Sequence, residues 1–196
     1  MRVSVLTSDN FKPTNWSGGT TTELYIFPNG ANFSNRDFGF RLSTATVELE
    51  SSDFTPLPGF HRDLLILEGA MSLTFNGEST QELAKFDVAT FEGDWKTTSK
   101  GICSDFNVMT NDDFEADVFG VTLTKSELTH VELEDQAHWL FIYNLSRPIT
   151  IIVGNKNFTI GAMELLIIEE VDFDEFSLHS DEDAECVITC ISELED

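Results

Sequence analysis

The sequence predicts an all-β fold built from two β-barrels in tandem. Short segments rich in Val, Ile, Thr and Phe recur along the 196 residues, with Gly, Pro and Asn turns between them. Helical periodicity is scarce, and only residues 111–120 leave room for one helical turn. A faint internal repeat adds to this, because residues 63–93 align with residues 138–170 by their pattern of apolar strands and glycine turns.

In the first half of the chain, successive side chains alternate between two faces, as they do in β-strands. Residues 38–50 place Phe40 and Leu42 on one face and Arg41 and Ser43 on the other. The Asn76-Gly77 pair is a strong hairpin signal. The expected strands of this half are residues 2–7, 20–28, 38–50, 63–69, 71–79, 85–94 and 103–109.

The second half repeats this rhythm. Its expected strands are residues 119–124, 138–146, 148–161, 162–170 and 186–193. The repeat places the junction between Asn111 and Ala116, so we expect one barrel over residues 1–112 and a second over residues 113–196.

The charge and the cysteines limit the classes of partner. The net charge is −24, and a surface this acidic repels phosphate backbones and anionic lipid, so we expect no nucleic-acid and no membrane partner. Cys103, Cys186 and Cys190 form no spaced framework, and the first residues do not resemble a signal peptide. We therefore expect a cytoplasmic protein with reduced thiols; whether it forms a homodimer is left open.

Three segments together carry a family resemblance: residues 15–28, 38–73 and 91–109. Their order and spacing resemble the HutD/Ves family of bacterial proteins. The matching positions are Trp16, Gly18, Gly19, Thr21, Glu23, Arg41, Ser43, Phe54, Pro58, Gly59, Arg62, Gly69, Gly93, Asp94, Asp105, Asn107 and Met109. The match covers about the first 110 residues, and Ser17 departs from the Asn that the family usually carries.

The resemblance implies a fold and a setting. The family is similar to bicupins, so it implies two cupin-like, jelly-roll barrels packed together, the second of them degenerate. Members are associated with histidine-utilisation operons, where HutD resembles a restraint on the pathway rather than one of its enzymes. The Ves branch is described only as stress-related.

The motif positions argue against a metal centre, and we expect no cofactor. A metal-binding cupin carries a Glu, then six residues, then a Gly, and counting back from Gly69 places Arg62 at the Glu position. The preceding His positions fall at or before Pro58, and no His follows Gly93 closely. Because such sites need several imidazoles and a carboxylate, we expect no metal, and the Arg favours an anion instead.

Two arginines are the candidate anion-binding groups. Arg62 suits a carboxylate, which histidine, urocanate and formylglutamate all carry; alternatively it pairs with Asp63. Arg41 shares a face with Ser43, and it either points into the barrel or extends from an edge strand to solvent.

Further polar and aromatic residues complete the predicted ligand site. Asp105 and Asn107 share a face with Met109, as a polar cluster for the ligand or as an internal salt bridge. Trp16 and Glu23 flank the Gly18-Gly19 pair, as the rim of a pocket or as a bulge.

The sequence favours binding over catalysis. We expect a non-catalytic regulator that binds a small carboxylate, such as urocanate or formylglutamate, in connection with histidine or amino-acid catabolism. The alternative is a metal-independent isomerase or hydrolase with His61 or Asp105 as acid–base, and a weaker one is an interaction module with a closed pocket. His61 is also placed with the ligand-binding residues, although a surface His without a role is an equal reading.

Overall fold

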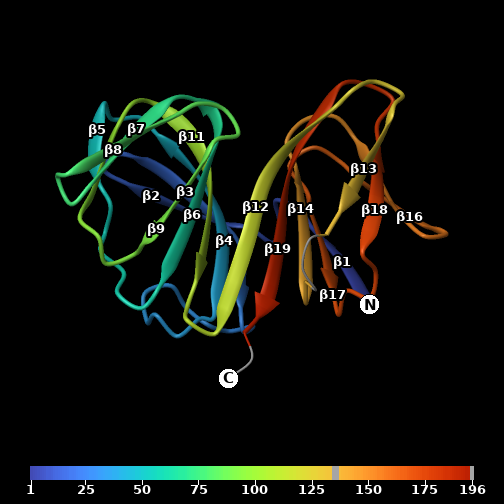
Figure 1. The fold of residues 1–196 in the computed structure, drawn as a ribbon, viewed down its shortest axis with the longest axis horizontal. Coiled ribbons are helices and arrows are strands. Elements are labelled where there is room, and N and C mark those ends of the chain that lie inside the picture. The colour runs from blue at the N-terminus through green and yellow to red at the C-terminus, as the bar shows by residue number, and fades with distance from the viewer. Residues whose placement is uncertain (134–136, 195–196) are drawn as a thin grey trace. The chain divides into compact units, whose positions relative to one another are not determined.

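A computed structural model describes residues 1–133 and 137–194, and every regular element in these ranges is a β-strand (Figure 1). The described residues contain no helix of the length and apolarity that crossing a membrane requires. The strands are β1 (Arg2–Leu6), β2 (Lys12–Trp16), β3 (Gly19–Phe27), β4 (Phe40–Val47), β5 (Ser51–Asp53), β6 (His61–Gly69), β7 (Met71–Phe75), β8 (Ser79–Leu83), β9 (Val88–Glu92), β10 (Thr97–Lys100), β11 (Cys103–Thr110), β12 (Phe114–Leu123), β13 (Leu128–Glu132), β14 (Trp139–Asn144), β15 (Ile149–Val153), β16 (Lys156–Ile160), β17 (Leu165–Glu169), β18 (Glu175–His179) and β19 (Ala184–Glu193).

The chain divides into two compact units. The first unit comprises Phe11–Glu115 together with Leu194, and the second comprises Met1–Asn10 and Ala116–Glu193. The first strand was expected in the barrel of residues 1–112, whereas β1 pairs with β17 and groups with the second unit. Its residues Val3 and Val5 face Ile168 and Leu166 across this pairing, which adds apolar contacts to the edge of that sheet.

The first unit is a pair of sheets. One has six strands in the order β2-β3-β4-β11-β6-β9, and the other has four in the order β5-β10-β7-β8. A core cluster takes residues from both, including Leu64 and Ile66 of β6 with Leu73 and Phe75 of β7. The predicted turn at Asn76-Gly77 joins β7 to β8, with φ of 54° and 72°. Such left-handed angles explain why Asn and Gly stand there.

The second unit is also a pair of sheets, one of five strands and one of four. The five-stranded sheet has the order β1-β17-β14-β19-β12, and the four-stranded sheet has the order β13-β18-β15-β16. Its core is apolar and continuous between the two sheets, with Leu140, Ile151, Leu166, Leu178 and Ile188 all fully buried. Such filling leaves the interior of this unit to side chains that pack against each other.

The two units repeat one topology. In the first, the order β4-β11-β6-β9 stands beside β5-β10-β7-β8; in the second, β12-β19-β14-β17 stands beside β13-β18-β15-β16. Eight consecutive strands of the first unit therefore correspond, one by one, to eight of the second. The hairpins β7–β8 and β15–β16 and the pairs β6–β9 and β14–β17 fall in the segments that the sequence aligned.

Two expectations about local structure need correction. Residues 114–123 form β12, not a helical turn, because this segment pairs with β19 at the edge of the five-stranded sheet. Pairing within a sheet outweighs weak local helical preference. No closed barrel is found in the described residues, where each unit consists of two separate sheets.

Candidate functional site

Three neighbouring strands of the first unit bring the two predicted arginines into one row. Met109 of β11 pairs with Arg41 of β4 on one side and with Arg62 of β6 on the other. Residues directly opposite each other in a sheet point to the same face, and those two apart on a strand do as well. Ser43, Asn107 and Asp105 therefore share this face with the arginines.

This face is the floor of a cavity of about 530 Å³ inside the first unit. The sheet strands supply its polar floor, and the segment Ala31–Ser34 and the residues Ser52–Thr55 supply its walls. Of the eight residues predicted for a ligand site, seven line it: Trp16, Glu23, Arg41, Ser43, Arg62, Asp105 and Asn107.

Arg41 is held by partners within the protein. Its Nε donates to Glu23 Oε2 at 2.8 Å, and its Nη1 donates to Ser43 Oγ at 3.1 Å. The ring of Phe33 lies under its guanidinium, 4.6 Å from ring centroid to Cζ. Glu23 also receives the Lys12 ammonium at 3.4 Å, so this carboxylate balances much of the charge of Arg41.

Arg62 is buried, and no carboxylate of the described residues forms an ion pair with it. Its Nη2 donates to the carbonyl oxygen of Thr55 at 2.8 Å, and Phe54 lies 5.6 Å from its Cζ. Its Nε is buried and has no hydrogen-bond acceptor. Burial lowers the pKa of Arg62 to about 10, with a further contribution from nearby Arg41, while Asp105 acts in the opposite direction. The guanidinium is therefore still a cation at neutral pH.

Asp105 and Asn107 form the other polar part of the floor. Burial raises the pKa of Asp105 to about 7, and attraction to Arg62 opposes this rise. The described residues provide no direct ion pair between this carboxyl group and Arg62. Asn107 is only 6% exposed, and its Oδ1 accepts no hydrogen bond. The internal salt bridge considered for this cluster is thus not formed.

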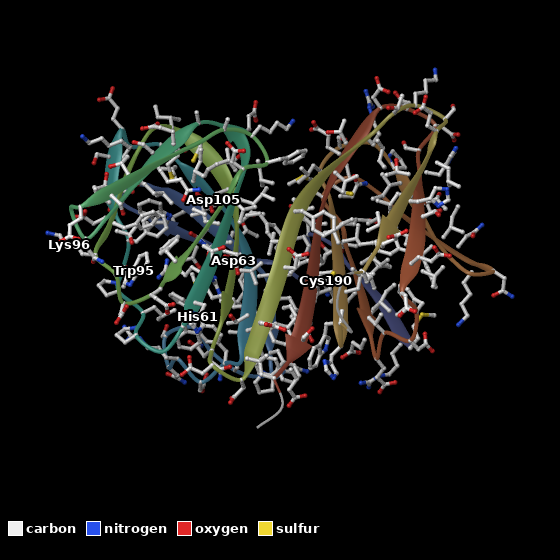
Figure 2. All side chains as sticks on the ribbon, in the orientation of Figure 1. His61, Asp63, Trp95, Lys96, Asp105 and Cys190 are labelled. Carbon is white, nitrogen blue, oxygen red and sulfur yellow. The ribbon has the colours of Figure 1, made fainter. Side chains whose placement is uncertain are left out.

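His61 lies apart from the cavity. Its Nδ1 is 2.9 Å from Glu92 Oε2 and its Nε2 is 3.3 Å from Asp112 Oδ1, at an exposed position. Because successive residues of a strand point to opposite faces, His61 and Asp63 both turn away from the face that carries Arg62. Figure 2 shows His61 well separated from Asp105. Asp63 accepts a hydrogen bond from Thr90 Oγ1.

Trp16, which lines the cavity, lies against the first glycine of the Gly18-Gly19 pair. A Cβ on Gly18 would lie 2.1 Å from Cζ3 of Trp16, so the indole ring lies directly against this glycine. A Cβ on Gly19 would lie 1.8 Å from the carbonyl oxygen of Thr46, where β3 approaches β4. At Gly19 the clash is with backbone, so this position needs the close approach that glycine permits, whereas the clash at Gly18 is with a side chain.

Sequence reasoning missed the walls of the cavity. Phe33, Phe54 and Thr55 lie outside the strands on the floor, and their contacts to the arginines depend on how the loops fold back. A Phe at position 33 within the polar run 29–37 was the one available signal for a buried contact there.

The donor set does not fit a metal ion. The described residues contain no group of three or more His, Cys, Asp or Glu side chains arranged to hold one. The floor offers two guanidinium groups, which repel cations, and the one cysteine nearby, Cys103, has its thiol pKa raised to about 12 by burial and by Asp105. That shift leaves Cys103 without nucleophilic thiolate at neutral pH.

A family model decides the relationship of the chain, because the HutD model matches residues 8–188. The chain belongs to the HutD family. The match extends through the second unit, well beyond the first 110 residues in which the motifs were visible.

Three known proteins illustrate the relationship. A Pseudomonas putida protein, described as the uncharacterized 21.2 kDa protein in the hutC 3′ region, is 30% identical over 113 residues, which is 55% of this chain and 58% of that protein. A conserved protein of unknown function from Pseudomonas aeruginosa PAO1 superposes with a TM-score of 0.83 at 21% identity, covering 98% of this chain and all of that one. HutD from Pseudomonas fluorescens SBW25 gives a TM-score of 0.75 at 20% identity, covering 99% and 100%.

The fold is also similar to cupin-like proteins. YhhW of Escherichia coli, a bacterial pirin, gives a TM-score of 0.72 at 11% identity, with complete coverage of both chains. At such identities these structures show a shared fold alone. The all-β, cupin-like character predicted from the sequence is confirmed.

Proposed function

We propose that this HutD-family protein is a non-catalytic regulator that binds a small carboxylate in the cavity of the first unit. Arg62 carries the proposal. It is a buried cation whose Nε lacks an acceptor and whose one hydrogen bond within the described residues goes to a backbone carbonyl. Asp105 attracts Arg62 without forming an ion pair with it in the described residues, and a bound carboxylate would supply a direct counter-charge and hydrogen-bond acceptors.

We propose that the bound carboxylate is an acid from histidine or amino-acid catabolism and that the protein acts in the cytoplasm. The HutD family and the Pseudomonas putida relative in the hutC 3′ region are both linked by name to histidine utilisation. Urocanate, formylglutamate or a similar carboxylate are the ligands that we propose. The cavity volume of about 530 Å³ is ample for acids of this size.

The finer architecture that we propose is a bicupin. Two observations support it: the repeated eight-strand topology, and the similarity to pirin and to oxalate decarboxylases over most of the chain. In this reading the first unit keeps the ligand cavity, and the second has a core filled by apolar side chains.

A thermal-shift screen with histidine, urocanate, formylglutamate and formate would identify a ligand for calorimetric titration. We expect Arg62→Ala to cost roughly 2–5 kcal/mol of binding, because the bound anion would be left unpaired. Arg62→Lys should restore little, since Lys cannot present two parallel donors. Arg147→Ala is the matched control, because it removes the same charge from an exposed position in the second unit.

Melting curves of all three variants separate binding from folding. Unchanged affinity in a folded Arg62→Ala protein would contradict the proposal. Loss of melting temperature without loss of affinity would make Arg62 a purely structural residue.

A metal-independent enzyme is the second candidate function. Asp105 favours it, because a buried carboxyl with a pKa of about 7 is suited to proton transfer near neutral pH. His61, the other acid–base considered, lies outside the cavity. NMR spectra of each ligand after prolonged incubation with the protein decide between the two, since a binding protein leaves the ligand unchanged.

A further inference from the structure

The segment of residues 54–57 joins the cavity to the surface of the first unit. On the cavity side, the carbonyl oxygen of Thr55 accepts a hydrogen bond from Arg62 Nη2 at 2.8 Å, and the ring centroid of Phe54 lies 5.6 Å from Arg62 Cζ. Both contacts are made by the arginine at which we propose that a carboxylate binds. A change in the position of this guanidinium therefore acts first on Thr55 and Phe54.

Behind Phe54, a chain of aromatic rings leads away from the cavity. The ring centroids of Phe54 and Phe91 are 5.9 Å apart, and those of Phe91 and Phe75 are 5.2 Å apart. Phe75 in turn lies 5.6 Å from Trp95. Phe75 and Phe91 are buried, whereas Trp95 is 37% exposed, does not line the cavity and lies apart from Asp105 in Figure 2. Because protein interiors are close-packed, the displacement of one ring is taken up by the next.

Backbone hydrogen bonds connect the same segment to the Trp95 turn, which is residues 93–96 between β9 and β10. The amide of Phe54 donates to the carbonyl oxygen of Thr97 at 2.9 Å, and the amide of Leu57 donates to that of Gly93 at 2.6 Å. Gly93 has little room to move on its own, because an added Cβ there would clash with the Leu57 carbonyl oxygen. The turn is therefore tied to this segment on both sides of Trp95.

A carboxylate changes the balance of contacts at Arg62. The Thr55 carbonyl is a neutral acceptor for this guanidinium. A carboxylate adds the attraction between opposite charges and accepts two parallel N–H bonds. A bound carboxylate therefore draws the guanidinium toward itself, and the contacts with Thr55 and Phe54 change.

We propose that binding of a carboxylate at Arg62 alters the Trp95 turn, through residues 54–57 and the rings of Phe91 and Phe75. The surface of the first unit then differs between the empty and the occupied protein. A regulator that catalyses nothing depends on such a difference, because a partner can respond only to a state that it can distinguish. This inference rests on the proposed carboxylate binding and adds the place at which the bound state is displayed.

Fluorine-19 NMR of protein labelled with 5-fluorotryptophan tests this inference. The sequence contains three tryptophans, and single substitutions to Phe assign their signals. Trp16 lines the cavity, Trp95 does not, and Trp139 belongs to the second unit. On titration with urocanate, and separately with formylglutamate, the Trp95 signal should shift and should saturate together with the binding that calorimetry measures. The Trp139 signal should stay in place.

Two arginine variants test the first step without any ligand. Arg62→Ala removes the contacts with residues 54–57, so it should shift the Trp95 signal of the empty protein. Arg41→Ala is the matched control, because Arg41 lines the same cavity but bonds to Glu23 and Ser43. An unchanged Trp139 signal shows that each variant is folded. Equal displacement of the Trp95 signal by both variants would contradict the link through residues 54–57.

Phe91→Leu tests the aromatic rings. Phe91 lies outside the cavity lining and between Phe54 and Phe75, so this substitution interrupts the ring contacts and leaves the lining intact. At saturation with the same acid, it should reduce the shift of the Trp95 signal by roughly half or more. An undiminished shift in the folded variant would overturn the role of the rings.

The outcomes separate this inference from the proposed function. Calorimetric binding of either acid with an unmoved Trp95 signal overturns the inference and leaves carboxylate binding standing; this comparison needs no variant. Absence of calorimetric binding by both acids contradicts the proposed function, and the inference with it.

Discussion

Arg41 and Arg62 lie in one row of a sheet but have different interaction partners, because the residues around each of them differ. Arg41 has Glu23 and Ser43 within hydrogen-bond distance, so its charge is already matched. Arg62, across Met109, has a backbone carbonyl and an aromatic ring. Glu23 reaches Arg41 because it is opposite Ser43 on β4, whereas β6 has no acidic residue on the cavity face beside Arg62. Arg62, rather than Arg41, is therefore the position at which we propose that an anion binds.

Asp105 should make the stability of the protein depend on pH. Its pKa is raised from 3.8 to about 7 in the folded state, so the folded protein holds a proton that the unfolded chain releases. The stabilisation by this proton is complete below pH 3.8 and is lost as pH rises to about 7, by an amount on the order of a few kcal/mol. Asp105→Asn should remove this component, so the variant should gain stability relative to the wild type as pH rises over this range.

Urea denaturation at several pH values measures the effect as a difference between the two proteins. Taking this difference cancels the contribution of the remaining acidic residues, which both proteins share. A difference that is constant from about pH 4 to pH 8 would show that Asp105 titrates normally in the folded state.

The sequence predicted the floor of the site better than its walls. Alternation along residues 38–50 and 103–109 placed Arg41, Ser43, Asp105 and Asn107 correctly on common faces. The same rule, applied to Arg62, excludes its neighbour His61, which was nevertheless included as a candidate. Phe33 and Thr55 were not predicted, because loop geometry has no period from which a facing direction can be read.

At the scale of elements, the hairpin of β2 and β3 depends on Gly19. This residue has a φ of 150°, and its added Cβ would meet the Thr46 carbonyl oxygen at 1.8 Å, which neither backbone can avoid without moving. Gly19→Ala should therefore lower the free energy of unfolding by roughly 1–3 kcal/mol. Because Gly19 pairs with Trp16, the change should also alter the fluorescence of that indole.

Gly161→Ala is a suitable control for this substitution. Its Cβ would meet only the flexible side chain of Glu164 at 3.4 Å. Denaturant unfolding of both variants should show a much larger loss for Gly19→Ala. Equal losses would mean that β3 can move away from β4 without a particular cost at this position.

Most of the strands were predictable, but β12 was expected only over its second half, and β2, β5, β10, β13 and β18 were not expected. Most expected segments overlap observed strands, because each carries its own alternation of apolar residues. Residues 111–120 lack a clear period of either kind, and only the pairing with β19 makes them a strand. The placement of β1 in the second unit could not be predicted either, since no local sequence pattern specifies that β1 pairs with a strand as distant in the chain as β17.

At the scale of the whole chain, the two units share an eight-strand topology although their sequences have few identical residues in common. The repeat could be detected only faintly, because strand order depends on apolar alternation and turns, and many sequences satisfy both. The two units differ in their interiors: the first contains buried arginines around a cavity, and the second contains an apolar core. This asymmetry locates the proposed ligand in one unit.

The overall charge makes this localisation testable. With a net charge of −24, the protein as a whole repels anions, so a small acid has no general reason to approach its arginines. Arg2 and Arg147, in the second unit, have side chains that are 68% and 62% exposed and already lie near acidic residues. Arg2 and Arg147 therefore serve as internal controls, because non-specific binding of the acid to exposed arginines would affect them in the same sample.

The most direct measurement is a carboxylate titration followed through the arginine Nε–Hε signals in nitrogen-15 NMR spectra. The five arginines of the sequence give separate reporters, assigned by single substitutions to Lys. We predict that the signals of Arg62 and Arg41 shift and saturate together, while those of Arg2 and Arg147 stay in place. Saturating shifts at Arg2 or Arg147 with Arg62 unmoved would contradict the central claim that the cavity of the first unit binds the carboxylate.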